Sequence, residues 1–244
     1  MGKRSGGVNP ASPKADRREV IYPPKRWELL KGLRERALEV MEALSRRGME
    51  ALAHGSLARG DVEEDSDIDL FLPQPFPSYL VETALLEAGL APERRELVMA
   101  TPWQLPKAHL HLDERTVVTF PLLKPRPLEL EFYHFGGALE REGLGRGERV
   151  PGVDKRLMLI EPTPSGHVES PVRGREGEVA KRLGVSLEIV RERVQVLTAR
   201  KEEGHTGLFL RRELSPSESF EEVFDSLARS HSFLRLRLKP GKPR

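Results

Sequence analysis

The residues with the clearest chemical potential lie between positions 54 and 73, in the segment HGSLARGDVEEDSDIDLFLP. Asp67 and Asp69 are separated by one apolar residue and lead into an apolar run. Because side chains at i and i+2 of a strand project to the same face, the two carboxylates are expected to converge. Converging carboxylates repel each other without a cation between them, and their oxygens suit Mg²⁺. Upstream, Gly55 permits close backbone approach, and Ser56 with the amides after it can hold phosphate oxygens. A metal site beside a phosphate-binding turn is the apparatus of phosphoryl or nucleotidyl transfer.

This pattern, GSLARGD followed by SDIDL, resembles the signature of the polymerase-beta-like nucleotidyltransferase superfamily and is similar to its small prokaryotic and archaeal members. The resemblance extends from about Pro24 to Phe135. It implies that the strand with the two aspartates holds catalytic Mg²⁺ and that Gly55 and Ser56 bind the triphosphate of an NTP, with ATP as the expected one. Arg59 has two interpretations, a phosphate contact or a structural ion-pair partner. A solvent-exposed acidic turn is the simpler alternative, but it does not explain an aspartate inside the apolar run.

A third carboxylate is the open question in this pattern. Catalysts of the superfamily usually carry one on a neighbouring strand, but the strand expected at Thr116–Phe120 offers Thr119 and no acid. Glu131 completes the site only if its segment, LELEFYHF, is extended. Apolar residues at i, i+4 and i+7 of that segment favour a helix, which would make Glu131 a surface or ion-pairing residue.

The flanking sequence predicts the elements that position these residues. The expected elements are a helix over Trp27–Arg47, a strand over Met49–Ala53, a helix over Pro77–Gly89, a strand over Arg95–Ala100 and a hairpin of Lys107–Leu112 with Thr116–Phe120. This order predicts an α/β (α+β) fold with a small mixed sheet, as the resemblance implies. His109 and His111 share one face of the hairpin, where they are expected as solvated polar residues or contacts for a nucleobase.

A second motif lies in Glu176–Lys201, where two short helical patterns meet at Gly184 and Ser186 is placed to cap the second helix. It resembles the winged helix-turn-helix of prokaryotic regulators, with Gly204–Leu214 as the expected wing. The second helix would be the recognition element, and its candidate nucleic-acid contacts are Arg191, Arg193 and Arg200. The alternative is an ordinary helical hairpin that packs on the catalytic domain. A final helix is expected over Phe220–Leu238.

Composition sets the wider limits. The chain has 244 residues and no cysteine, which excludes a disulfide framework and cysteine-ligated zinc. No apolar run approaches the roughly 18 residues of a membrane span, and the basic N-terminus lacks the apolar core of a secretory signal. A soluble, cytoplasmic protein is therefore expected. The chain is expected to begin with a disordered basic leader (1–22), followed by a nucleotidyltransferase domain (23–139). A linker (140–174) comes next, with the domain boundary near residues 166–174. A helix-turn-helix-like module (175–238) and a basic tail (239–244) complete the expected organisation.

These features predict Mg²⁺-dependent transfer of a nucleoside monophosphate from an NTP to an acceptor hydroxyl. Two alternatives stay open. The first is a nucleotide-sensing DNA-binding regulator with a degenerate nucleotidyltransferase fold. The second is an antitoxin-type enzyme that modifies a partner protein. The acceptor is not fixed, because an RNA 3′ end, a protein hydroxyl and a small alcohol fit the pattern equally well.

Overall fold

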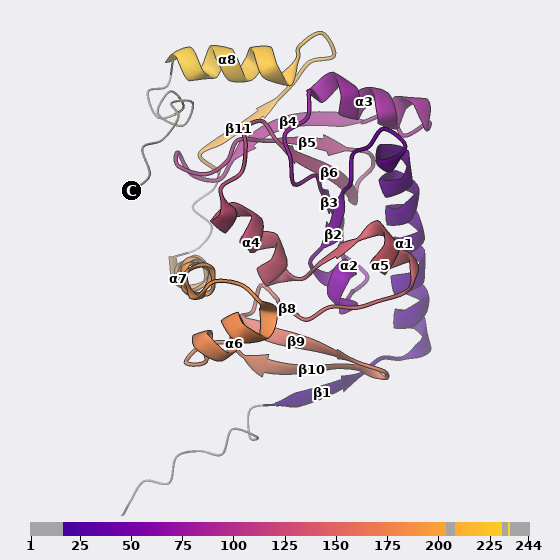
Figure 1. Cartoon of the computed structure of the whole chain (residues 1–244), viewed down its shortest axis with the longest axis vertical. Helices are drawn as coiled ribbons and strands as arrows, with labels where there is room; N and C mark the ends of the chain where they lie inside the picture. The colour runs from indigo at the N-terminus through magenta and orange to yellow at the C-terminus, as the bar shows by residue number, and fades with distance from the viewer. Residues whose placement is uncertain (1–16, 204–207, 231–233, 235–244) are drawn as a thin grey trace, which may run out of the picture.

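The computed structural model describes residues 17–203, 208–230 and 234, and it contains two β-sheets (Figure 1). The larger sheet has seven strands in the order β11-β4-β5-β6-β3-β2-β7. These strands are β2 (Leu52–His54), β3 (Ile68–Phe71), β4 (Arg94–Met99), β5 (Lys107–His111), β6 (Thr116–Pro121), β7 (Ala138–Glu140) and β11 (Leu210–Glu213). β3 and β6 pair in parallel and the other neighbours are antiparallel. The expected α/β class with a mixed sheet is confirmed.

Helices cover both faces of this sheet. The described helices are α1 (Pro24–Ser45), α2 (Ser56–Arg59), α3 (Ser78–Glu87), α4 (Pro127–Gly136), α5 (Arg141–Gly145), α6 (Glu176–Leu183), α7 (Leu187–Glu203) and α8 (Phe220–Ser230). α1 and α3 pack on the face that carries the buried Ile68 and Leu70. α4 covers the opposite face, where the Tyr133 ring stacks on Phe71 with centroids 3.6 Å apart. Asp69 lies on this second face, because it alternates with Ile68 and Leu70 along β3.

Most predicted local elements of the first half are confirmed, but the strand expected over Met49–Ala53 begins three residues later, as β2 (Leu52–His54). α1, α3 and β4 lie within a few residues of their expected bounds, and β5 pairs with β6 as the expected hairpin. Ala108 and Leu110 of β5 are fully buried, whereas His109 projects to the other face. These segments were predictable because their apolar residues alternate, or recur at helical spacing, within a short stretch of sequence.

The second sheet was not expected. Its order is β1 (Arg18–Ile21), β10 (Gly166–Pro171), β9 (Met158–Thr163) and β8 (Gly152–Val153). The prediction of a disordered leader is therefore wrong for 18–21, and residues 140–174, expected as a linker with a domain boundary, contain α5 and three strands. Gly166 admits β1, because a Cβ at this position would lie 1.9 Å from the carbonyl oxygen of Val20. Residues 1–16 and the predicted basic tail lie outside the described residues.

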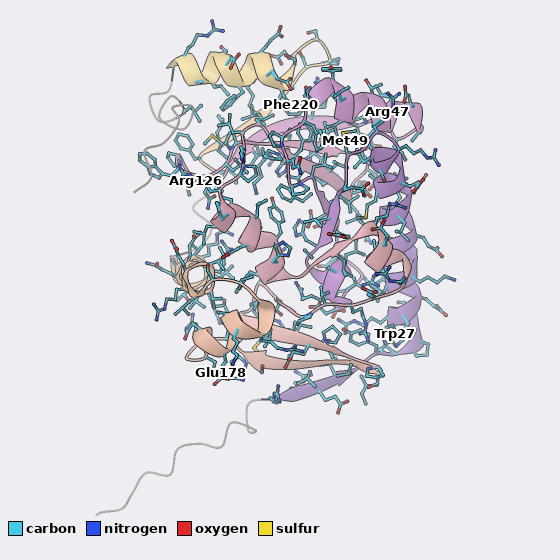
Figure 2. All side chains as sticks on the ribbon, viewed as in Figure 1. Trp27, Arg47, Met49, Arg126, Glu178 and Phe220 are labelled. Atoms are coloured by element: carbon cyan, nitrogen blue, oxygen red, sulfur yellow. The ribbon has the colours of Figure 1, made fainter. Side chains whose placement is uncertain are left out.

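α4 lies between the two sheets and contacts both (Figure 1). At the foot of α1 the aromatic rings of Tyr22 and Trp27 lie 5.0 Å apart and join that helix to the smaller sheet. Figure 2 shows Trp27 at this end of α1, with Met49 and Phe220 at the other end, in the region of α3 and α8. The large sheet, α4 and the small sheet thus form successive layers.

The helix-turn-helix prediction is correct for two helices and wrong for the wing. α6 and α7 meet at Gly184, whose φ is 67°, and Ser186 Oγ accepts a hydrogen bond from the Ile189 amide at 3.2 Å. The described part of the expected wing, however, contains β11, which pairs with β4 at the edge of the large sheet. α7 packs on α4 through the buried Ile189 and Val190. The described residues thus correspond to the helical-hairpin alternative.

Within the described residues, no helix is both long enough and apolar enough to cross a membrane.

Candidate active site

Asp67 and Asp69 line one pocket of about 560 Å³ together with Gly55 and Ser56. Asp69 lies in β3 and Asp67 immediately precedes that strand. Burial and the neighbouring charge of Asp69 raise the pKa of Asp67. No hydrogen bond or ion pair joins either carboxylate to another residue in the described ranges. Two unneutralised carboxylates that face one pocket are a donor set that fits a hard divalent cation such as Mg²⁺.

The turn after β2 gives the pocket its second chemical feature. Gly55 has a φ of 74°, which favours glycine, and its carbonyl accepts hydrogen bonds from the Ala58 and Arg59 amides at 3.1 Å each. The backbone N–H groups of Ser56 and Leu57 donate to no other described residue. Such a turn leaves two N–H donors at the edge of the pocket, where they can bind an anion.

Arg59 is held by protein groups at the base of this turn. Its Nη2 pairs with Asp61 Oδ2 at 3.0 Å and its Nη1 donates to the Gly136 carbonyl at 2.6 Å. Both side chains of the ion pair are less than a tenth exposed. The side chain also packs against Gly137, where a Cβ would lie 2.8 Å from Arg59 Cγ. Arg59 therefore forms the structural ion pair, which was one of its two interpretations.

Glu131 does not complete the carboxylate site. Its segment is the helix α4, and its Oε2 accepts hydrogen bonds from the amide of Ser186, at 3.1 Å, and from the Ser186 hydroxyl. The helix that the apolar spacing predicted is confirmed, so the condition under which Glu131 would face the aspartates is not met. On the neighbouring strand β6, Val117 is the residue opposite Asp69. Among the described residues no group of three or more His, Asp or Glu side chains is placed to hold a metal ion.

The rest of the pocket wall consists of residues that the sequence did not indicate as part of the site. Phe132 and Phe135 of α4 line it, as do Lys155 and Arg156 in the turn before β9. The two phenylalanines were visible as an apolar stripe, but nothing in the local sequence of 154–156 indicates a site. Arg156 is already paired with Asp154 and Glu169. No ion pair joins Lys155 to the rest of the described chain.

His54, at the end of β2, also faces this pocket. Its ring meets Tyr133 edge-on with centroids 4.9 Å apart. Burial lowers the pKa of His54, and this effect outweighs the opposing charge of Asp69. The imidazole is therefore neutral at neutral pH and adds no positive charge beside the aspartates.

The three arginines predicted to contact nucleic acid do not share one surface. Arg193 is buried, lies 4.9 Å from the centroid of Phe132 and lines the aspartate pocket. Arg200 is exposed and lines a neighbouring pocket. Arg191 is exposed and lines neither of these two pockets.

The fold and the site together give an α/β domain with one pocket that two carboxylates and a glycine turn line. Residues 34–118 match the family model described as a nucleotidyltransferase domain. The matched segment runs from α1 into β6 and so contains Gly55, Ser56 and both aspartates. About a third of the chain is thus similar to a nucleotidyltransferase domain, which supports nucleotidyl transfer as the general chemistry of this segment. No curated protein and no solved structure matches the chain significantly.

Proposed function

We propose that the protein is a Mg²⁺-dependent nucleotidyltransferase that uses an NTP, with ATP as the expected donor. The observation that carries the proposal is the convergence of Asp67 and Asp69 on the pocket that also contains the Gly55–Ser56 turn. In this proposal the aspartates hold Mg²⁺, while the turn binds the β- and γ-phosphates through its free N–H groups. Lys155, across the pocket, neutralises further phosphate charge.

The reaction replaces one phosphoester linkage by another. The acceptor hydroxyl oxygen forms a bond to the α-phosphorus, and the bond from that phosphorus to the bridging oxygen breaks. Pyrophosphate leaves with the bonding electron pair, and the hydroxyl proton passes to solvent. Bound Mg²⁺ supplies charge stabilisation to the reacting and leaving oxygens. The protein side chains orient the triphosphate, and α4 with its two phenylalanines limits the access of water to one side of the pocket.

Nucleotide binding without transfer is the second candidate function. It is favoured by Val117, which stands opposite Asp69 where a further carboxylate would complete the metal site. Two aspartates can bind one Mg²⁺ with the triphosphate but give less support to a second metal ion that activates the acceptor. A nucleotide-sensing regulator would fit such a site. The described residues offer no observation that favours the antitoxin-type alternative.

The deciding experiment combines thermal melting with incorporation of labelled nucleotide. We expect Mg-ATP to raise the melting temperature of the wild type, and we expect Asp67→Asn and Asp69→Asn to abolish this shift. Glu64→Gln is the matched control, because Glu64 lies in the same acidic turn but does not line the pocket. Incorporation that depends on both aspartates supports transfer. A Mg-ATP shift without incorporation supports the second candidate, and equal shifts in all variants contradict both.

A further inference from the structure

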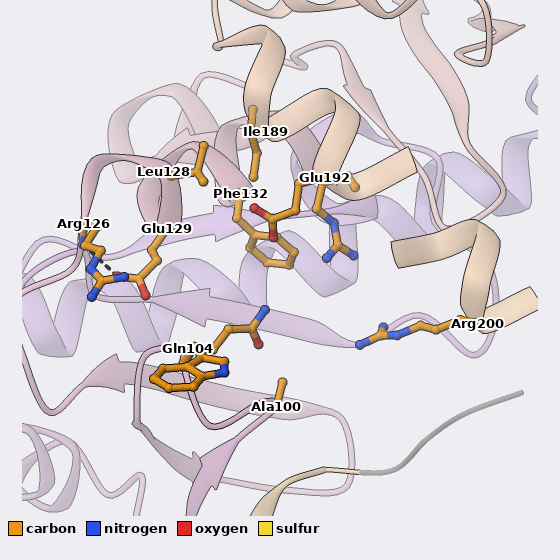
Figure 3. A pocket seen from close by; sticks show the side chains of 11 residues that line it. Ala100, Gln104, Arg126, Leu128, Glu129, Phe132, Ile189, Glu192 and Arg200 are labelled. Atoms are coloured by element: carbon orange, nitrogen blue, oxygen red, sulfur yellow. Dashed lines mark hydrogen bonds between the residues drawn. The ribbon is translucent and has the colours of Figure 1, made fainter. Parts of the chain in front are cut away.

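A second pocket of about 270 Å³ adjoins the aspartate pocket between α4, α7 and the loop that joins β4 to β5. Phe132 and Arg193 line both pockets, so one ring and one guanidinium separate the two spaces. Figure 3 shows Phe132 and Gln104 pointing into the second pocket from opposite sides, and Arg200 reaching toward it from α7. The second pocket contains neither the aspartates nor the Gly-Ser turn.

Arg193 is the most unusual residue of this pocket. Its exposed fraction is 8%, yet no hydrogen bond or ion pair joins its guanidinium to any other described residue. Burial, followed by the charge of Arg200, lowers its pKa and outweighs the opposing charge of Glu192. Buried charges in proteins are normally paired. The Arg193 guanidinium lies over the Phe132 ring and has no hydrogen-bond or ion-pair partner among the described residues, so its N–H groups on the pocket wall can bind an anion.

The other residues of this pocket define the rest of the ligand. Trp103 is 61% exposed and lies on the loop, and Phe132 presents an aromatic ring from α4. Arg126 and Arg200 add two guanidinium groups, against the carboxylates of Glu129 and Glu192. Aromatic rings beside arginines are the combination that binds unpaired nucleotides, because bases stack on the rings and phosphates meet the cations.

We infer that this second pocket binds the acceptor, and that the acceptor is a single-stranded nucleotide chain. Its terminal base lies against Trp103 and Phe132, and its phosphate is bound by Arg193 and Arg200. The inference rests on the proposed function, since the first pocket must hold the NTP for the second to hold the acceptor. In this inference α7 helps to bind the end of a single strand. The sequence had instead predicted that this helix enters the DNA major groove.

Size and position favour a single strand over a duplex. A space of about 270 Å³ is slightly smaller than the range of about 300–1,000 Å³ for small-ligand pockets and accommodates about one nucleotide. Because Phe132 and Arg193 border both pockets, a terminal hydroxyl can point across them toward the NTP. A duplex, in contrast, would contact the exposed face of α7, and Arg193 does not lie on that face because it is buried against α4.

The test measures binding of a fluorescent single-stranded pentaribonucleotide to the full chain, without Mg²⁺ and without NTP. Trp103→Ala is expected to weaken binding about tenfold or more, as loss of a stacked base contact does. Arg200→Gln is expected to weaken it and to lower the salt dependence by about one unit of slope, as loss of one phosphate contact does. Lys201→Gln is the matched control, because Lys201 neighbours Arg200 on α7 but lines neither pocket. Arg193→Met, which keeps an apolar stem on Phe132, is expected to weaken binding most.

Melting with Mg-ATP separates this inference from the proposed function. We expect Trp103→Ala and Arg200→Gln to keep the wild-type Mg-ATP shift, and Asp67→Asn to lose that shift while it still binds the oligonucleotide. Oligonucleotide binding without any Mg-ATP shift in the wild type supports the pocket and contradicts the proposed function. Equal oligonucleotide affinity in wild type, Trp103→Ala and Arg200→Gln overturns the inference. Tighter binding of duplex DNA that depends on Arg191 also overturns it.

Discussion

Asp67 illustrates how a candidate metal ligand differs from a structural aspartate. Its pKa is raised by burial and by the charge of Asp69, which together outweigh the charges of Lys155 and Arg115, and no described cation forms an ion pair with it. The folded protein therefore binds a proton at Asp67 more tightly than the unfolded chain does. In the absence of metal, the negative charge of this residue works against folding at neutral pH. An unfavourable charge of this kind is expected at a residue that serves function and not stability.

The first prediction is that Asp67→Asn does not lower the melting temperature of the metal-free protein at pH 7 and raises it slightly. The pKa of Asp67 in the folded protein is raised above the usual 3.8, so the stability of the wild type falls as pH rises from 3.8 through the folded pKa. The asparagine side chain of the variant carries no charge and therefore avoids this loss of stability. The difference between variant and wild type should vanish below pH 3.8, where the carboxyl is protonated in both states. Calorimetry across pH measures this, with Glu64→Gln as control. A large loss of stability in Asp67→Asn at pH 7 would identify a structural aspartate.

Arg59 is the opposite case, a charge that lines the same pocket and already has protein partners. It ties α2 to the end of α4 through Asp61 and the Gly136 carbonyl. Both partners of the ion pair are buried, so each charge depends on the other for neutralisation. The position of the Gly-Ser turn relative to α4 follows from this contact.

The second prediction is that Arg59→Met lowers the free energy of unfolding by about 3–5 kcal/mol, because it leaves Asp61 buried without a partner. Asp61→Asn in the Arg59→Met background should recover part of the loss, since it removes the uncompensated charge. Denaturant unfolding of the two single variants and the double variant measures the coupling. Additive losses in this cycle would show that Arg59 and Asp61 act independently.

At the scale of elements, Glu131 joins α4 to the start of α7 through Ser186. The carboxylate satisfies N-terminal groups of α7 that have no partner within that helix. The contact fixes the helix that carries Arg193 against the helix that carries Phe132. Both pockets depend on the relative position of these two helices.

The third prediction is that Glu131→Gln keeps Mg-ATP binding and lowers stability by about 1–2 kcal/mol, as expected when a hydrogen bond to a charged group is weakened. Ser186→Ala should cost a similar amount, and the double variant should cost little more than either single one. Chemical denaturation measures the stabilities and thermal shift measures the binding. Loss of the Mg-ATP shift in Glu131→Gln alone would restore a direct role for this carboxylate in the site.

β11 is attached to the large sheet by charge as well as by its ladder. The buried carboxylate of Glu96 in β4 accepts two hydrogen bonds from Arg211 of β11 and one from His111. Burial alone would raise the pKa of Glu96, but the bonds from Arg211 and His111 and the charge of Arg94 lower it on balance. A carboxyl with a lowered pKa stabilises the fold above its ordinary pKa of 4.5 and loses that effect as pH falls.

The fourth prediction is therefore that β11 detaches from β4 in acid before the sheet unfolds. Hydrogen exchange of residues 210–213 should rise as pH falls below 4.5, after correction for the intrinsic rate. Arg211→Gln should show this faster exchange already at pH 7. Arg212→Gln is the control, because Arg212 pairs with Glu218 and not with Glu96. Exchange in Arg211→Gln equal to that of the control would contradict the electrostatic attachment.

The elements also show where local sequence stops being informative. The helix of residues 24–45 and the β5–β6 hairpin were predictable because their apolar residues repeat within one short window. The turn at Gly184 and the cap at Ser186 were predictable because glycine and serine are themselves local signals for a turn and a cap. In contrast, Arg18–Ile21 and Leu210–Glu213 are only four residues long and show no apolar repeat, and their partners β10 and β4 lie more than a hundred positions away. The convergence of the aspartates followed from strand alternation, whereas Lys155 and Arg193 reach the pocket only through tertiary packing.

At the scale of the whole molecule, the small sheet supports one wall of the aspartate pocket. Lys155 and Arg156 lie in the turn before β9, and β9 pairs with β10, which pairs with β1. Tyr22 follows β1 and its hydroxyl is hydrogen-bonded to His167 Nδ1 at 2.6 Å. The N-terminal strand is thus connected to the pocket through two strands, β10 and β9.

The final prediction is that Gly166→Ala displaces β1 and weakens nucleotide binding at a distance. A Cβ at Gly166 would lie 1.9 Å from the Val20 carbonyl oxygen, so the strands cannot keep their spacing, and overpacking of this kind costs about 1–3 kcal/mol. Gly177→Ala is the matched control, because a Cβ there meets nothing within 4 Å and alanine favours the helix α6. Hydrogen exchange should rise in 18–21 for Gly166→Ala alone, and its Mg-ATP melting shift should decrease. If exchange rises while the Mg-ATP shift stays at the wild-type value, the turn at 154–156 holds its position without β1, and the proposed support of the pocket by the N-terminal strand is wrong.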